Sequence, residues 1–167
     1  MGKNRALIIG VNEYVEDKKF NKLGYAENDA DSFYQVLIDP NIGDFKKEDV
    51  TFLIGQVTKS DVEENLERIL SESSKGDTVV IYFGGHGKLD KSNSLCLVTH
   101  STKADRLLST SVHWGVIQKM IEQSDCQSIV FLIDSCFSGA AGIRGGESLP
   151  VETIKELEKG EGSVISQ

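Results

Sequence analysis

Two short segments of the chain place a chemically reactive side chain directly after an apolar run. The sequence YFGGHG occupies residues 82–87, and the sequence DSCFSG occupies residues 134–139. A cysteine is a strong nucleophile only as a thiolate, and a nearby imidazole or a group of backbone N–H donors favours that form. His86 and Cys136 are therefore a candidate general base and a candidate nucleophile, provided that the fold brings them together.

The rest of the sequence predicts the elements that must position these residues. Four apolar runs rich in β-branched residues are typical of buried strands: 6–11, 50–54, 78–83 and 128–133. Apolar residues at helical spacing lie within 30–37, 62–70 and 112–121. The second helix is expected to begin at Ser60, with Glu63 completing a capping box. This alternation predicts an α/β fold, a three-layer αβα sandwich with a mostly parallel central sheet.

The two reactive segments follow the third and fourth predicted strands. In an open parallel sheet, ligands bind beyond the carboxyl ends of the strands, so His86 and Cys136 are expected at one edge if those strands are neighbours. Gly84, Gly85 and Gly87 let the backbone approach a substrate closely, and an N–H group of this loop could stabilise an oxyanion. Such an arrangement is typical of acyl transfer through a thiol.

Other interpretations of the candidate residues are weaker. A lone cysteine is commonly a small buried packing residue, which is the expectation for Cys96 and Cys126. A phosphate-binding loop that includes Gly87 would need a glycine in place of Tyr82. The histidines show neither HExxH nor HxxxH spacing and the cysteines show no CxxC spacing, so the sequence predicts no metal site and no cofactor.

The reactive segments also resemble those of a known family. Residues 82–87 and 134–139 look like the two catalytic blocks of caspase-like cysteine peptidases, and the metacaspases and orthocaspases are the most similar branch. A third segment, LGYAENDA at residues 23–30, is similar to the Leu-x-Gly-Cys-x-Asn-Asp-Ala block that follows the first strand in that family. The order of the blocks matches the family, as does the interval of roughly 50 residues between His86 and Cys136.

The resemblance implies a role for each matching residue. Cys136 would be the nucleophile and His86 its acid–base partner, with the backbone N–H groups of Gly87 and Cys136 as the oxyanion hole. Asp29 and Asp134 match the positions that line the pocket for the residue before the scissile bond in metacaspases. Two carboxylates attract a guanidinium or ammonium group, so the expected partners are protein or peptide substrates cleaved after Arg, and less readily after Lys.

Composition narrows the class of partner and the location. The 167-residue chain has 18 Lys and Arg against 26 Asp and Glu, a formal net charge of -8, which argues against general binding to nucleic acid or to an anionic membrane. No signal peptide and no membrane-spanning apolar run is recognised, so a cytoplasmic location is expected. Few acidic residues follow His86, so calcium dependence is not expected.

The chain is expected to divide into a domain and a tail. Residues 1–142 are predicted to form the catalytic domain, similar to a caspase large subunit, and residues 143–167 a linker or tail without a further strand. Arg144, Lys155 and Lys159 are candidate processing sites within the tail. Caspase-like domains usually continue past the cysteine with further elements, so a small-subunit-like chain or a regulatory protein is an expected partner.

Two other functions remain open at this point. The first is a catalytically incomplete caspase-like scaffold or peptide-binding module that does not turn over its ligand. The second is a phosphate- or nucleotide-binding α/β domain. The presence of both His86 and Cys136 speaks against the scaffold, whereas the lack of the elements that usually follow the cysteine speaks for it. The nucleotide-binding alternative would be supported only by thermal stabilisation on addition of a nucleotide.

Overall fold

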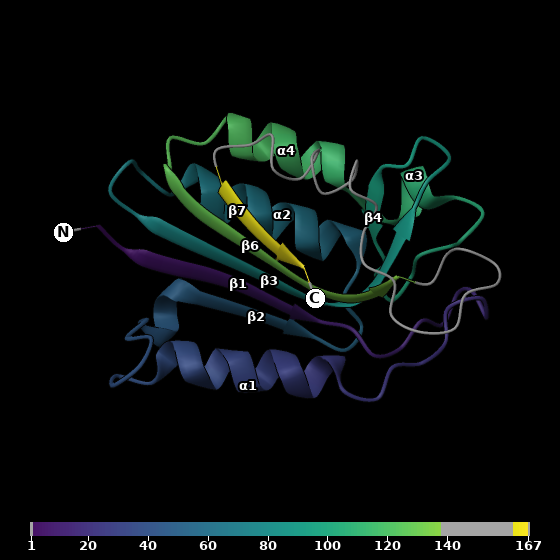
Figure 1. Ribbon diagram of the computed structural model, residues 1–167, viewed down its shortest axis with the longest axis horizontal. Coiled ribbons are helices and arrows are strands. Elements are labelled where there is room, and N and C mark those ends of the chain that lie inside the picture. The colour runs from purple at the N-terminus through teal and green to yellow at the C-terminus, as the bar shows by residue number, and fades with distance from the viewer. Residues whose placement is uncertain (1, 138–161, 167) are drawn as a thin grey trace.

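The computed structural model describes residues 2–137 and 162–166, and Figure 1 shows the elements that they form. The strands are β1 (Asn4–Gly10), β2 (Val50–Ile54), β3 (Thr78–Leu89), β4 (Leu95–Leu97), β5 (Val112–His113), β6 (Ser128–Phe137) and β7 (Gly162–Ser166). The helices are α1 (Ala26–Ile38), α2 (Lys59–Ser71), α3 (Leu107–Thr110) and α4 (Trp114–Glu122), with a 3-10 turn at Lys47–Asp49. None of the helices in this part of the chain is long and apolar enough to cross a membrane.

A single mixed sheet is built around β3. This strand pairs in parallel with both β1 and β6, and β2 and β7 extend the parallel part of the sheet beyond those two neighbours. β4 and β5 add an antiparallel arm to the carboxyl end of β3. The predicted mostly parallel central sheet is therefore confirmed.

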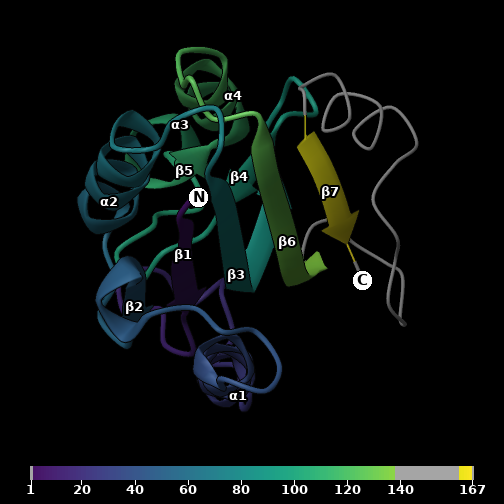
Figure 2. The same cartoon turned by 90° about the vertical axis from the view of Figure 1, so that its left-hand side faces the viewer.

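Helices cover both faces of the sheet, as Figure 2 shows. Successive side chains of a strand point to opposite faces, so Leu7 and Ile9 of β1 lie on one face and Ala6 and Ile8 on the other. Leu7 and Ile9 pack in the larger core with residues of α2 and α4, whereas Ala6 and Ile8 pack in a smaller core with residues of α1. The three-layer αβα sandwich is confirmed.

The predicted start of the second helix is wrong by two residues. Thr58, not Ser60, is the N-cap of α2. The Thr58 hydroxyl accepts a hydrogen bond from the backbone N–H of Asp61 at 3.2 Å, and the Asp61 carboxylate accepts one from the backbone N–H of Thr58 at 2.8 Å. Glu63, the expected partner of the capping box, instead lies 3.6 Å from Lys59. Both threonine and serine can cap a helix, so residue type alone does not distinguish the two positions.

The predicted ends of two strands are also wrong. β3 and β6 both continue beyond Phe83 and Ile133, so His86 and Cys136 lie inside paired strands and not in loops. The two strands remain paired with each other through residues 87 and 137, and β4 pairs with residues 87–89 of β3. Backbone pairing with neighbouring strands outweighs the low strand propensity of the glycines.

The expectation of a tail without a strand is wrong for residues 162–166. These residues form β7, which pairs in parallel with β6. Residues 138–161, including the candidate processing sites Arg144, Lys155 and Lys159, lie outside the described part of the chain.

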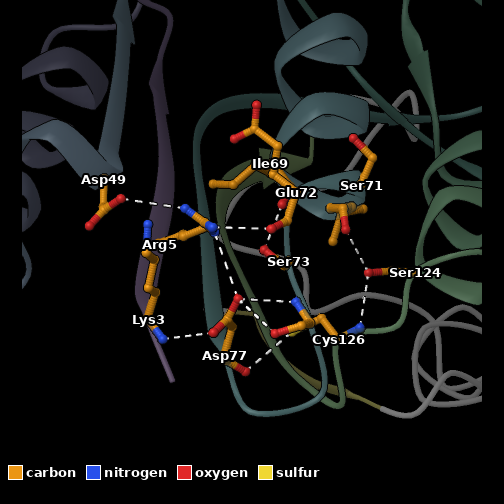
Figure 3. Close-up of polar contacts among 12 residues, drawn as sticks. Lys3, Arg5, Asp49, Ile69, Ser71, Glu72, Ser73, Asp77, Ser124 and Cys126 are labelled. Carbon is orange, nitrogen blue, oxygen red and sulfur yellow. Dashed lines mark hydrogen bonds and ion pairs between the residues drawn. The ribbon is translucent and has the colours of Figure 1, made fainter. Parts of the chain in front are cut away.

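A polar network joins several elements at the amino-terminal ends of the strands (Figure 3). The carboxylate of Asp77, which precedes β3, accepts hydrogen bonds from the backbone N–H groups of Lys3 at 2.7 Å and Ser74 at 3.0 Å. Arg5 of β1 lies between two carboxylates, with Nη1 3.4 Å from Asp49 and Nε 4.0 Å from Asp77. The network therefore holds the start of β1 against the segment that leads into β3.

The two other cysteines are buried, as expected for packing residues. Cys126 is 7% exposed and Cys96 is fully buried. The Cys126 thiol donates to the carbonyl oxygen of Asp77 at 3.3 Å and so connects the segment before β6 to the same network.

Replacing Asp77 with Asn should lower the melting temperature at neutral pH, by on the order of 5 °C. The N–H donors of Lys3 and Ser74 hold the pKa of Asp77 below its usual value, and the charge of Arg5 adds to this effect. A carboxyl whose pKa is lowered by folding stabilises the fold above its unfolded pKa and loses that contribution as the pH falls through its folded pKa. The difference between parent and variant should therefore shrink in acid.

Thermal unfolding followed by circular dichroism at a series of pH values checks this prediction. Asp105→Asn, at an exposed position, is the matched control for the loss of one negative charge. A difference between parent and Asp77→Asn that stays constant from neutral to acidic pH would contradict the electrostatic explanation.

Candidate active site

His86 is held by the segment that connects β1 to α1. Its side chain is 5% exposed, and its ring lies with its centroid 4.8 Å from that of Tyr14 and 6.0 Å from that of Phe20. The backbone N–H of His86 donates to the Tyr14 hydroxyl at 3.0 Å, and this hydroxyl donates to the carbonyl oxygen of Val11 at 2.7 Å. Both the ring and the backbone of His86 are therefore fixed.

The contacts of the imidazole determine which nitrogen is basic. Nε2 of His86 lies 2.7 Å from the carbonyl oxygen of Asn21. A carbonyl oxygen only accepts hydrogen bonds, so the neutral ring carries its proton on Nε2 and a lone pair on Nδ1. Nδ1 is buried and has no hydrogen-bond partner among the residues that the structure describes. The ring thus presents one unoccupied basic nitrogen.

The sheet brings the two predicted dyad residues to the same level. β3 and β6 are paired over residues 78–87 and 128–137, and the register places His86 opposite Cys136. Neighbouring strands lie about 4.8 Å apart, so the two backbones are adjacent at this point. Gly87 is the next pair along, opposite Phe137. Ser138 and Gly139, the last residues of the second motif, lie outside the described residues.

The two predicted pocket carboxylates lie around one tyrosine. Tyr82 of β3 donates its hydroxyl to the carboxylate of Asp134 at 3.0 Å, and its ring stacks on Phe33 of α1 with centroids 4.9 Å apart. Asp29, in the first turn of α1, is close enough for its charge to affect the same hydroxyl. Asp29 and Asp134 are both exposed, and within the described ranges neither forms an ion pair with a basic side chain.

The environment of Tyr82 keeps its hydroxyl protonated. Burial raises its pKa well above the usual value, and the negative charge of Asp134, the hydrogen bond to Asp134 and the charge of Asp29 raise it further. The hydroxyl is therefore a permanent hydrogen-bond donor at physiological pH, and it orients the carboxylate of Asp134.

Two glycines allow α1 to lie close to the sheet at this site. Gly10 of β1 and Gly84 of β3 are opposite one another in the register. A Cβ atom on Gly10 would lie 2.8 Å from the Cβ of Ala30 and 3.0 Å from the carbonyl oxygen of Ala26, and a Cβ on Gly84 would lie 3.1 Å from that oxygen. Since the same turn of α1 carries Asp29, this close approach sets the distance of that carboxylate from the sheet.

The residues that hold His86 are not among those predicted from the sequence. Asn21 acts through its main-chain carbonyl oxygen, which depends on the path of the chain and not on residue type. Tyr14 and Phe20 act through their rings, and two buried aromatic residues in a largely polar segment are a signal that sequence reasoning could have used.

A separate cavity of about 310 Å³ lies beyond the carboxyl ends of β1 and β2. The described residues that line it are Asn12, Glu13, Lys22, Glu27, Gly55, Gln56 and His100. Glu13 and Lys22 form an ion pair across its wall, and Nδ1 of His100 lies 2.9 Å from the carbonyl oxygen of Glu13. None of the predicted site residues lines this cavity.

Comparisons with known proteins agree with this fold. Residues 3–165 match the family model of the caspase domain. The crystal structure of protein GSU0716 from Geobacter sulfurreducens is similar, with a TM-score of 0.63 and 20% identity over 83% of this chain and 52% of that one. The structure of pro-sf-caspase-1 is also similar, with a TM-score of 0.53 and 16% identity over 89% of this chain and 51% of that one. No curated protein sequence matches the chain.

The fold and the family match define a caspase-like class of protein. The chain belongs to the caspase domain family, since the family model covers almost all of it. The predicted resemblance to caspase-like cysteine peptidases is confirmed. The chain spans about half the length of the two solved structures that it matches. The roles of individual residues and the metacaspase or orthocaspase branch stay predictions.

Replacing Gly10 with Ala should destabilise the protein by about 1–3 kcal/mol, because the new methyl group overlaps the first turn of α1. Gly24→Ala is the matched control, since a Cβ atom at Gly24 meets no heavy atom within 4 Å. Urea unfolding of the three proteins measures the difference in free energy. Equal stability of Gly10→Ala and Gly24→Ala would show that α1 does not depend on the close approach.

Proposed function

We propose that this chain is the dyad-bearing part of a cytoplasmic cysteine endopeptidase that cleaves after basic residues, with Arg preferred over Lys. The observation that carries the proposal is the register of β3 and β6, which sets His86 opposite Cys136, together with the unoccupied basic nitrogen of His86. A histidine whose other nitrogen is held by a carbonyl group is suited to remove a proton from a neighbouring thiol.

The proposed reaction is acyl transfer through a thioester. Nδ1 of His86 takes the proton of the Cys136 thiol, and the thiolate attacks the carbonyl carbon of the scissile bond. The backbone N–H groups of Gly87 and Cys136 stabilise the oxyanion. The imidazolium then returns the proton to the departing amine, and water, activated by His86, hydrolyses the thioester. The carbonyl oxygen of Asn21 stabilises the imidazolium through the 2.7 Å contact with Nε2.

The proposed preference for Arg rests on the two carboxylates around Tyr82. Asp29 and Asp134 are exposed and lack a basic partner among the described residues, so a cation of the substrate can bind them without displacing one of the protein. A planar guanidinium makes two parallel hydrogen bonds to a carboxylate, whereas an ammonium acts as a point charge. The hydroxyl of Tyr82 limits rotation of the Asp134 carboxylate and so favours the more directional cation.

The main alternative is a caspase-like scaffold that binds peptides without cleaving them. For either function, a second, small-subunit-like chain or a regulatory protein is a proposed partner. The peptidase and the scaffold would use the same acidic pocket of Asp29 and Asp134, and they differ in whether Cys136 reacts with the bound peptide.

Incubation with peptidyl electrophiles ending in Arg or Asp should yield a single covalent adduct with the Arg probe, seen as a mass increase of the intact protein. Cys136→Ala should abolish the adduct, and His86→Ala should slow its formation by about 10²–10⁴-fold, because the thiolate is then no longer favoured. Cys126→Ala is the matched control for loss of a thiol and should react like the parent. An unreactive Cys136 in the folded parent would favour the scaffold.

Replacing Asp29 or Asp134 with Asn should reduce the rate of labelling by the Arg probe by at least about tenfold, because a charged partner of the guanidinium is lost. Labelling by a matched probe with a neutral side chain should change little. Asp31→Asn, an exposed position on the same helix, is the control for the loss of one negative charge. An unchanged ratio of Arg to neutral labelling in both variants would refute the pocket while leaving the dyad intact.

A further inference from the structure

A second cluster of reactive side chains lies where the end of β3 turns into the antiparallel arm of β4 and β5 (Figure 2). Asp90 lies in the turn after β3, Cys96 in β4 and His113 in β5. One ligand atom from each of the three residues lies within 4.8 Å of the others. None of these residues has a part in the proposed peptidase reaction.

The register of the arm places the thiol and the imidazole together. Cys96 is directly opposite His113 in the antiparallel pairing of β4 with β5, and on its other side Cys96 is opposite Lys88 of β3. Side chains at directly opposite positions of neighbouring strands leave the sheet on the same face and contact one another. The pairing of the two strands thus places the Cys96 and His113 side chains next to each other.

The third side chain is oriented by the turn in which it lies. One carboxylate oxygen of Asp90, Oδ1, accepts hydrogen bonds from the backbone N–H groups of Ser92 at 2.7 Å and Ser94 at 3.0 Å. The other oxygen, Oδ2, lies 3.0 Å from Nε2 of His113. Both the position and the direction of this carboxylate are therefore fixed before any ligand binds.

We propose that Asp90, Cys96 and His113 bind a zinc ion. Thiolate, imidazole and carboxylate are the three ligand types that proteins offer to zinc, at about 2.0–2.3 Å from the metal, so tetrahedral ligand atoms lie roughly 3.3–3.7 Å apart. The 3.0 Å separation of Asp90 and His113 needs to open only slightly, and the Cys96 sulfur to move inward, to reach this geometry. Water or another donor completes the tetrahedron.

Zinc matches this donor set better than the hard cations do. Calcium requires six to eight oxygen ligands and magnesium a near-octahedral oxygen shell, whereas two of the three donors here are sulfur and nitrogen. Cys96 is fully buried, while the side chains of His113 and Asp90 are 19% and 11% exposed. The ion would therefore reach the sulfur past the His113 and Asp90 side chains.

Binding requires two changes in proton position. The Cys96 thiol loses its proton to solvent as the zinc–sulfur bond forms, so one proton is released for each ion bound. The proton that His113 holds on Nε2 moves to Nδ1 so that Nε2 can donate its lone pair to zinc. Nδ1 now accepts a long hydrogen bond of 3.3 Å from the backbone N–H of Gly115, and this contact is given up.

The bound ion would hold together the antiparallel arm that follows the strand of His86. Only residues 87–89 of β3 separate His86 from Asp90, and these residues pair with β4. Linking the turn to β4 and β5 stabilises the end of β3 without contributing a group to the acyl transfer. The site therefore does not depend on the proposed function.

The test uses the whole chain carrying Cys136→Ala, so that the candidate dyad cannot bind metal through its thiol. After removal of metal with a chelator, the protein is titrated with Zn²⁺ by calorimetry and with Co²⁺ by absorption spectroscopy. The expected results are one ion per chain, about one proton released, a rise in melting temperature with Zn²⁺, and a cobalt spectrum with a thiolate-to-metal charge-transfer band.

The ligand variants are Cys96→Ser, His113→Gln and Asp90→Asn, made in the same background. Changing a residue that hydrogen-bonds to a metal ligand costs about 10–100-fold in metal affinity, and loss of a ligand itself should cost at least as much. Cys96→Ser should also abolish the charge-transfer band. Cys126→Ser and His100→Gln, a buried cysteine and a buried histidine outside the cluster, are the matched controls and should bind like the parent.

Several outcomes would overturn the proposal. They are the absence of stoichiometric zinc binding to the parent, a charge-transfer band that survives Cys96→Ser, and equal affinity in the parent and the two conservative variants His113→Gln and Asp90→Asn. Circular dichroism confirms that each variant is folded, and a variant that fails to fold is judged by the remaining two. Peptidase activity is not a readout, so the outcome is separate from that of the proposed function.

Discussion

The pairing of β3 with both β1 and β6 is the constraint on which the rest of the structure depends. Its register with β6 sets His86 opposite Cys136, and its register with β1 sets Gly84 opposite Gly10. Side chains alternate with a period of two, so a slip of one residue would send every apolar side chain of β3 to the wrong core. The burial of Phe83 on one face and Tyr82 on the other therefore holds the candidate site in register.

The polar groups at the two ends of the sheet differ in their partners. At the amino-terminal ends of the strands, the Asp77 carboxylate accepts hydrogen bonds from backbone N–H groups and lies beside Arg5. At the carboxyl ends, Nδ1 of His86 and the carboxylate of Asp29 keep lone pairs that none of the described basic groups or donors occupies. A polar group without a partner is costly for folding, and such groups are common at functional sites.

The antiparallel arm of β4 and β5 supports the end of β3. β4 and β5 are short, and their few backbone hydrogen bonds are a weak support for a strand end that carries a candidate catalytic histidine. The hydrogen bond between Asp90 and His113 closes the arm, and a zinc ion joined by Cys96 would close it more firmly. In this view, the same strand connects a candidate reaction centre with a candidate structural metal site.

The sequence by itself determined the elements whose signal is local. Continuous apolar runs predicted the four main strands, helical spacing predicted α1, α2 and α4, and the blocks around His86 and Cys136 predicted the family. Tertiary structure decided what local signals cannot carry. β3 extends through the glycines at 84, 85 and 87, and β6 extends through residues 134–137, because neighbouring strands pair with them. The N-cap of α2 is Thr58 because of the path of the chain. Asn21 holds His86 through a main-chain atom, which no residue type encodes. Asp90, Cys96 and His113 follow no metal-binding spacing, and they meet because the antiparallel pairing of β4 with β5 places His113 opposite Cys96.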